Sequence, residues 1–148
     1  MATTSFDNVD TIKQFPLGTV LMQDGNAYSY LQGVGSVVAG SWVSFDENGV
    51  TTLLAANAKG RVGIAMAACD ATTKFGWFQV YGKAVGKVLA AFADNGIPFA
   101  TATAGSVDDA VVTGDLVLNA IGRSAIDTPV TGQAYFELNY PSVNDTLG

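Results

Sequence analysis

The chain has 148 residues, of which 49% are hydrophobic and 14% are charged, and its formal net charge is −6. The excess of 13 acidic over 7 basic residues excludes the electrostatic footprint of a nucleic-acid-binding protein. The chain has no histidine and a single cysteine, Cys69, so it lacks the commonest metal ligand and cannot form an intramolecular disulfide. We therefore expect one globular domain without a cofactor.

Residues 1–18 are predicted to form an extended N-terminal arm. They are mostly polar and end in the turn-forming triplet Pro16-Leu17-Gly18. Their Thr, Ser and Asn content favours an extended segment over a helix. The apolar side chains within the arm are candidate anchors for contact with another protein: Phe6, Val9, Ile12 and Phe15.

Residues 19–148 are predicted to form an all-β domain, a small β-barrel or β-sandwich. Short runs rich in valine, threonine and aromatic residues alternate with turn signals such as Asp24-Gly25 and Asn95-Gly96. Strands at such short intervals are typical of sandwiches and barrels. The expected strands are residues 19–23, 27–32, 36–38, 41–45, 50–54, 62–68, 76–81, 83–89, 98–102, 115–119 and 134–139.

Residues 75–92 contain a strand with two apolar faces and a segment whose spacing fits either a strand or a helix. In residues 75–81, Phe75, Trp77 and Tyr81 fall on one face while Phe78 and Val80 fall on the other. Such a two-faced strand is either central in a two-layer core or part of a subunit interface. In residues 85–92 the apolar spacing also suits a helix, but nearby glycines favour a strand followed by a turn, with a short helix as the alternative.

Motifs that suggest catalysis or ligand binding have simpler structural interpretations. Residues 82–88 have only three residues between their glycines and no Ser or Thr after the lysine, so they do not form a phosphate loop. Residues 46–49, Asp-Glu-Asn-Gly, lack the spacing of a calcium loop and predict a hairpin turn. Asp108, Asp109 and Asp115 are expected to be solvated turn carboxylates, although paired carboxylates could also serve a hydrolase. Cys69 is expected to be a buried small apolar residue.

The middle of this acidic chain is locally basic. Five of the seven basic residues fall between positions 59 and 87, where Asp70 is the only acidic residue. We expect this segment to bind an acidic partner or the acidic part of a second copy. The candidates for self-association or docking are Trp42, Arg61, Trp77, Tyr81, Lys83 and Lys87.

Neither a membrane span nor a signal peptide is expected. The most apolar stretches, residues 62–69 and 88–93, are much shorter than the roughly 18 residues that a spanning helix needs. Residues 1–10 contain neither a basic region nor an apolar region. The sequence thus predicts synthesis in a cytosol-like compartment.

Several short motifs in a fixed order resemble a known family. They are Val-Val-Ala-Gly at 37–40, Phe-Asp-Glu-Asn-Gly-Val at 45–50, Arg-Val-Gly-Ile-Ala at 61–65, Gly-Trp-Phe-Gln-Val-Tyr-Gly-Lys-Ala at 76–84, residues 99–110, Thr-Gly-Asp at 113–115 and Leu-Asn-Tyr-Pro at 138–141. From about residue 34 to 141 the chain resembles the capsid decoration, or cement, proteins of tailed bacteriophages.

This resemblance implies a β-tulip-like or barrel protein without catalytic residues. Such a protein lies on the outer surface of the virion capsid, contacts the major capsid protein and stabilises the shell. The resemblance implies a homotrimer, with a dimer as the alternative, and an N-terminal arm that crosses capsid subunits. A second hypothesis is a head-fibre or tail-associated protein that binds a host glycan by stacking sugars on Trp42, Trp77 or Tyr30.

Overall fold

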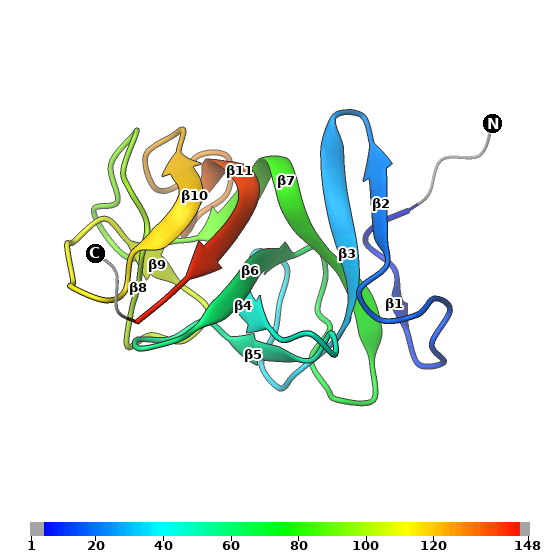
Figure 1. The fold of residues 1–148 in the computed structure, drawn as a ribbon. Coiled ribbons are helices and arrows are strands. Elements are labelled where there is room, and N and C mark those ends of the chain that lie inside the picture. The colour runs from blue at the N-terminus through cyan, green and yellow to red at the C-terminus, as the bar shows by residue number, and fades with distance from the viewer. Residues whose placement is uncertain (1–4, 146–148) are drawn as a thin grey trace.

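The computed structural model describes residues 5–145 and shows eleven strands and, within that range, no helix. The all-β prediction is confirmed: the strands form one curled sheet that resembles half of a barrel (Figure 1) and a small second sheet of β8 and β9. The strands are β1 Val9–Asp10, β2 Val20–Gln23, β3 Asn26–Gln32, β4 Trp42–Phe45, β5 Thr51–Leu53, β6 Gly60–Ala65, β7 Phe75–Lys87, β8 Phe99–Ala100, β9 Val107–Asp108, β10 Val117–Gly122 and β11 Gln133–Val143.

The long strand β7 organises the sheet. Along one edge, the first half of β7 pairs with β3. Along the other edge, β7 pairs first with β1, then with β6 and finally with β11. The strand changes direction at Gly82, whose φ of +95° suits glycine. The buried side chain of Gln79 stabilises this bend because its amide donates hydrogen bonds to the carbonyl oxygens of Tyr81 and Lys83, at 3.1 and 3.0 Å.

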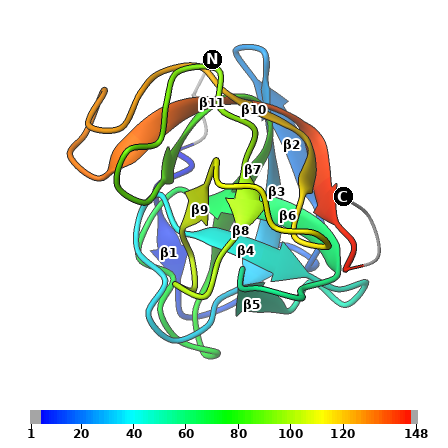
Figure 2. The same ribbon diagram turned by 90° about the vertical axis from the view of Figure 1, so that its left-hand side faces the viewer.

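The remaining strands extend the sheet on both sides of β7. The hairpin β2–β3 forms one end, and the order β11-β6-β4-β5 leads to the other. Strand β10 pairs with β11 outside this path. Figure 2 shows β8 and β9 in front of the curled sheet when the molecule is turned.

Most predicted turns and strands are present, but the short strands β1 and β9 were not expected, β11 extends to Val143, and three other elements differ. Residues 36–38 form a turn instead of a strand, because Ser36 has a left-handed φ of +72°. The two strands expected at 76–81 and 83–89 are the single strand β7, because Gly82 permits a bend without ending the strand. The strand expected at 115–119 is β10, two residues later. Residues 85–92 form a strand and then a turn, as predicted.

The buried side chains form two cores, which lie on opposite faces of β4 and β6 because successive residues of a strand point to opposite faces. The larger core contains Trp42, Ile64, Phe92 and Phe136, and the smaller one contains Val43, Ala65 and Phe78. A third apolar cluster lies on the outer face of β3 and β7, where the N-terminal arm covers it. Within residues 5–145 no helix is long and apolar enough to cross a membrane.

Candidate functional site

The described part of the arm, residues 5–18, lies on the outer face of its own sheet. The ring of Phe6 stacks on Tyr28 with 3.8 Å between centroids and meets the edge of Trp77 at 5.2 Å. Val9 is half-buried and pairs with Gly76 in β7. Phe6 was a candidate for capsid contact, but here it is buried within its own chain, because the aromatic side chains of β3 and β7 offer it an apolar surface.

The next part of the arm forms a loop that one hydroxyl group holds at both ends. Tyr30 Oη donates a hydrogen bond to the Asp10 carboxylate at 2.6 Å and accepts one from the backbone N–H of Gln14 at 3.2 Å. Phe15 packs its ring against Tyr30, with 5.3 Å between centroids. Ile12 lies between these anchors, and its side chain is 74% exposed. The loop therefore presents an apolar side chain from a fixed backbone.

Tyr30 makes the free energy of unfolding vary with pH in the alkaline range. Burial, followed by its hydrogen bond to Asp10, raises the pKa of Tyr30 to about 12, against about 10 in an unfolded chain. The folded state therefore binds this proton more tightly. The resulting stabilisation is complete below pH 10 and is lost as the pH rises from 10 to 12, by roughly 2 kcal/mol.

We expect Tyr30→Phe to flatten this part of the pH profile of the free energy of unfolding, measured by urea titration. Burial also raises the pKa of Cys69 to about 11, so both proteins should carry Cys69→Ala to remove an overlapping titration. Equal losses of stability between pH 10 and 12 in the two proteins would show that Tyr30 does not hold its proton in the folded state.

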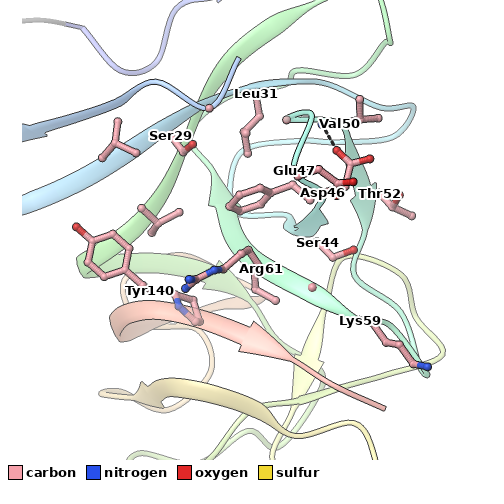
Figure 3. A pocket seen from close by; sticks show the side chains of 18 residues that line it. Ser29, Leu31, Ser44, Asp46, Glu47, Val50, Thr52, Lys59, Arg61 and Tyr140 are labelled. Carbon is pink, nitrogen blue, oxygen red and sulfur yellow. Dashed lines mark hydrogen bonds between the residues drawn. The ribbon is translucent and has the colours of Figure 1, made fainter. Parts of the chain in front are cut away.

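A groove occupies the concave face of the curled sheet. Its volume is about 1020 Å³, and its walls come from the hairpins β2–β3 and β4–β5 (Figure 3). Val20, Phe45 and Val50 contribute exposed or partly exposed apolar side chains to its lining. Tyr140 and Pro141 of β11 complete the lining close to a register shift between β10 and β11, where Tyr140 has a left-handed φ of +50°.

Charges of both signs surround this groove. Lys59 and Arg61 lie two residues apart at the start of β6, and neither forms an ion pair within residues 5–145. The Asp46 carboxylate closes the β4–β5 turn by accepting hydrogen bonds from the N–H groups of Asn48 and Val50, each at 3.0 Å. The predicted hairpin at residues 46–49 is therefore confirmed. The apolar lining and two free cations suit an extended segment with apolar and acidic side chains.

The structure separates the other residues proposed for self-association. Trp42 is fully buried and Trp77 is 4% exposed, so neither side chain reaches the surface; this corrects their assignment as interface residues. Trp42 points into the larger core, whereas Trp77 lies on the outer face of β7, where Phe6 and Phe15 of the arm cover it. Tyr30 is also fully buried, so none of the three side chains proposed to stack on a glycan is exposed.

Tyr81, Lys83 and Lys87 lie along the second half of β7. Tyr81 is 37% exposed and packs against Tyr140, with 5.5 Å between ring centroids. The Lys83 ammonium lies 4.0 Å from the centre of the Tyr135 ring, a cation–π contact. Lys87 is half-buried, and its backbone carbonyl accepts a hydrogen bond from Trp42 Nε1 at 3.1 Å. Of the basic candidates, Arg61 alone lines the groove.

The three aspartates considered for hydrolysis bind backbone groups. The Asp109 carboxylate accepts a hydrogen bond from Ala93 N at 2.9 Å, and Asp108 accepts one from the next residue's N–H. Asp115 was expected to be solvated, but it is 3% exposed and accepts a hydrogen bond from Asn57 N at 2.8 Å. Asp115 therefore connects two loops that are distant in sequence. These contacts give all three carboxylates structural roles.

The buried position predicted for Cys69 is confirmed, with 2% exposure. Its thiol packs close to Gly76 of β7, in the smaller core. Lys74 forms an ion pair with Asp70 at 2.8 Å, which lowers the pKa of Asp70 and raises that of Lys74. Lys74 is thus unavailable as a free cation of the basic segment.

The sequence reasoning missed the groove and the role of Tyr140. Alternating residues of β2 and β3 signal two faces, but no local pattern indicates that β11 supplies a further wall. The Leu-Asn-Tyr-Pro motif marked the position of Tyr140 without indicating its role.

Comparison of this chain with protein-family models, with curated proteins and with solved structures gave no match.

Proposed function

We propose that this protein is a capsid decoration protein of a tailed bacteriophage, which binds the outer surface of the head and stabilises the shell by bridging major capsid protein subunits. The observation that carries the proposal is the loop of residues 11–14, which Tyr30 holds in place and which exposes Ile12. A loop fixed before binding loses little conformational entropy on docking. An apolar residue in such a loop is therefore an effective contact with another protein.

The groove provides a second contact surface for the same role. Its apolar lining, together with Lys59 and Arg61, which form no ion pair with residues 5–145, suits a segment of the shell that carries apolar and acidic side chains. A protein that contacts two subunits gains affinity because its second contact is effectively intramolecular. Binding to the assembled shell alone then stabilises that shell by mass action. The sequence resemblance supports this role independently of the geometry.

The experiment measures binding to expanded shells that were purified without the protein. We expect the wild-type chain to bind them at many sites per particle and to raise the temperature at which they disassemble. Ile12→Asp should weaken binding at least about 30-fold, which corresponds to about 2 kcal/mol for a central apolar contact. Quantitative sedimentation of shells with bound protein measures the affinity.

Val111→Asp is the matched control for Ile12→Asp. The two side chains are similarly exposed, at 76% and 74%, but Val111 lies in the loop between β9 and β10, on the side of the molecule opposite to the arm (Figure 1). We expect Val111→Asp to bind within about threefold of the wild type. Failure of the wild-type protein to bind shells would refute the proposed function, whereas equal binding by both variants would refute the role of Ile12 alone.

A further inference from the structure

Strand β2 forms an open edge of the sheet. It pairs with β3 on one side and with no strand on the other, within residues 5–145. Figure 1 shows β2 on the outer side of the hairpin, with β3 between β2 and β7. Residues 5–18 of the arm do not cover this edge, because β1 pairs with β7 and Phe6 stacks on the face of Tyr28.

The hairpin turn determines which backbone groups face this open edge. Asp24 and Gly25 have φ values of +55° and +81°, as in the two-residue turns that favour hairpins. The residues that flank such a turn, Gln23 and Asn26, exchange backbone hydrogen bonds, and bonded pairs then alternate along the ladder. Val20 and Met22 fall between the bonded pairs, so their N–H and C=O groups point outward.

The side chains of this edge are apolar and exposed. Val20 is 48% exposed and Met22 is 67% exposed, and both lie on the face opposite to the arm. The strand sequence Val-Leu-Met-Gln contains no charge and no proline. Soluble proteins usually protect a free edge with lysine, proline or a bulge, because an unprotected edge pairs with other strands. The outward-pointing backbone and exposed side chains of Val20 and Met22 therefore have the properties of a pairing surface.

We propose that β2 pairs with β2 of a second copy of this chain, antiparallel and about a twofold axis at Leu21. In this register Val20 lies opposite the partner's Met22, and Met22 lies opposite the partner's Val20. Both pairs have outward-pointing backbone groups, so four hydrogen bonds form across the axis. The exposed apolar side chains then cover one another on one face, and no like charges are opposed.

The edge is self-complementary, which favours a second copy over an unrelated strand as its partner. A twofold interface requires one patch to fit itself, and this register satisfies both the hydrogen bonds and the apolar side chains of β2. Four residues bury much less than the ~800 Å² per partner of a standard interface. The pairing is therefore weak in dilute solution and strengthens where many copies lie close together. It does not depend on the proposed function.

Disulfide trapping tests this pairing in the full-length chain. Leu21 would face its own copy in a non-hydrogen-bonded pair with about 4.5 Å between Cα atoms, within the range that a disulfide bridges. We expect Leu21→Cys to form a covalent dimer under mild oxidation. Gln23→Cys, on the same strand and face, should cross-link at least about tenfold more slowly, because it would lie opposite the partner's Thr19. The only native cysteine, Cys69, is buried, so background cross-linking is low.

Two further measurements keep the test decisive. An equimolar mixture of Thr19→Cys and Gln23→Cys chains should form a heterodimer, which tests the register without changing the half-buried Leu21. Adding Met22→Lys should suppress Leu21→Cys cross-linking at least about fivefold, whereas adding Val111→Lys should not. Folded Leu21→Cys protein that stays monomeric, or cross-linking as fast in Gln23→Cys alone, would overturn the proposal. Shell binding without homodimers would assign the edge to a strand of the shell.

Discussion

Replacing Trp42 by alanine is expected to lower the free energy of unfolding by about 3–5 kcal/mol, the cost of truncating a large aromatic side chain in a core. Trp42 is fully buried, and its ring meets Phe136 edge-on with 4.8 Å between centroids. The variant also leaves the Lys87 carbonyl without the hydrogen bond from Trp42 Nε1. Such a loss is a large part of the 5–15 kcal/mol that stabilises a typical domain.

Urea unfolding followed by circular dichroism measures this effect. Trp42→Phe should be less destabilising because it keeps an aromatic ring in the core, and Tyr81→Ala, at a 37% exposed position, should cost less than about 1 kcal/mol. These variants separate a core role from an interface role. If Trp42→Ala unfolded like the wild type but lost self-association, the original assignment of Trp42 to an interface would be correct.

Gly86→Ala is expected to destabilise the protein by about 1–3 kcal/mol because it overpacks the same core. A Cβ atom at position 86 would lie 2.6 Å from Trp42 Nε1 and 3.0 Å from Ile64 Cδ1. Gly86 also pairs with Ala134 of β11, so the strand cannot move away without disturbing that ladder. The small residue at position 86 is therefore required by the indole that packs over it.

Gly35→Ala provides the control for this substitution. A Cβ atom at Gly35 would meet nothing within 4 Å, so we expect a change below about 0.5 kcal/mol. Combining Gly86→Ala with Trp42→Phe should cost less than the sum of the two single changes, because the smaller ring leaves space for the methyl group. Strict additivity in thermal and urea unfolding would contradict direct contact between the two positions.

Local chemistry accounts for the features that the sequence predicted correctly. The turns at Asp24-Gly25 and at residues 46–49 follow from side chains and glycines that act within four residues of one another. The all-β class follows in the same way from β-branched and aromatic runs. The burial of Cys69 follows from its apolar neighbours in the sequence.

The assignment of surface residues required information that no local pattern contains. Trp77 occupies a two-faced strand, which suits a core and an interface equally well, and the arm that packs on this strand buries it. Trp42 is buried because β4 pairs with β6 and places it in the larger core. Arg61 lines an open groove because the curl of the sheet brings residues of β2, β3, β5 and β11 to the same hollow as the start of β6. An aromatic residue in a strand was therefore not enough to predict an exposed interface residue. Trp42 and Trp77 are buried, whereas Tyr81 is partly exposed.

The sequence by itself determined the fold class, the main turns and the presence of apolar anchors in the arm. The tertiary structure alone decided that Phe6 covers its own sheet, that Ile12 stays exposed and that Asp115 is buried against Asn57. The physical reason is the range of the interactions. Turn formation and strand propensity depend on neighbouring residues, whereas burial depends on which distant strands pair, and that outcome is a property of the whole chain.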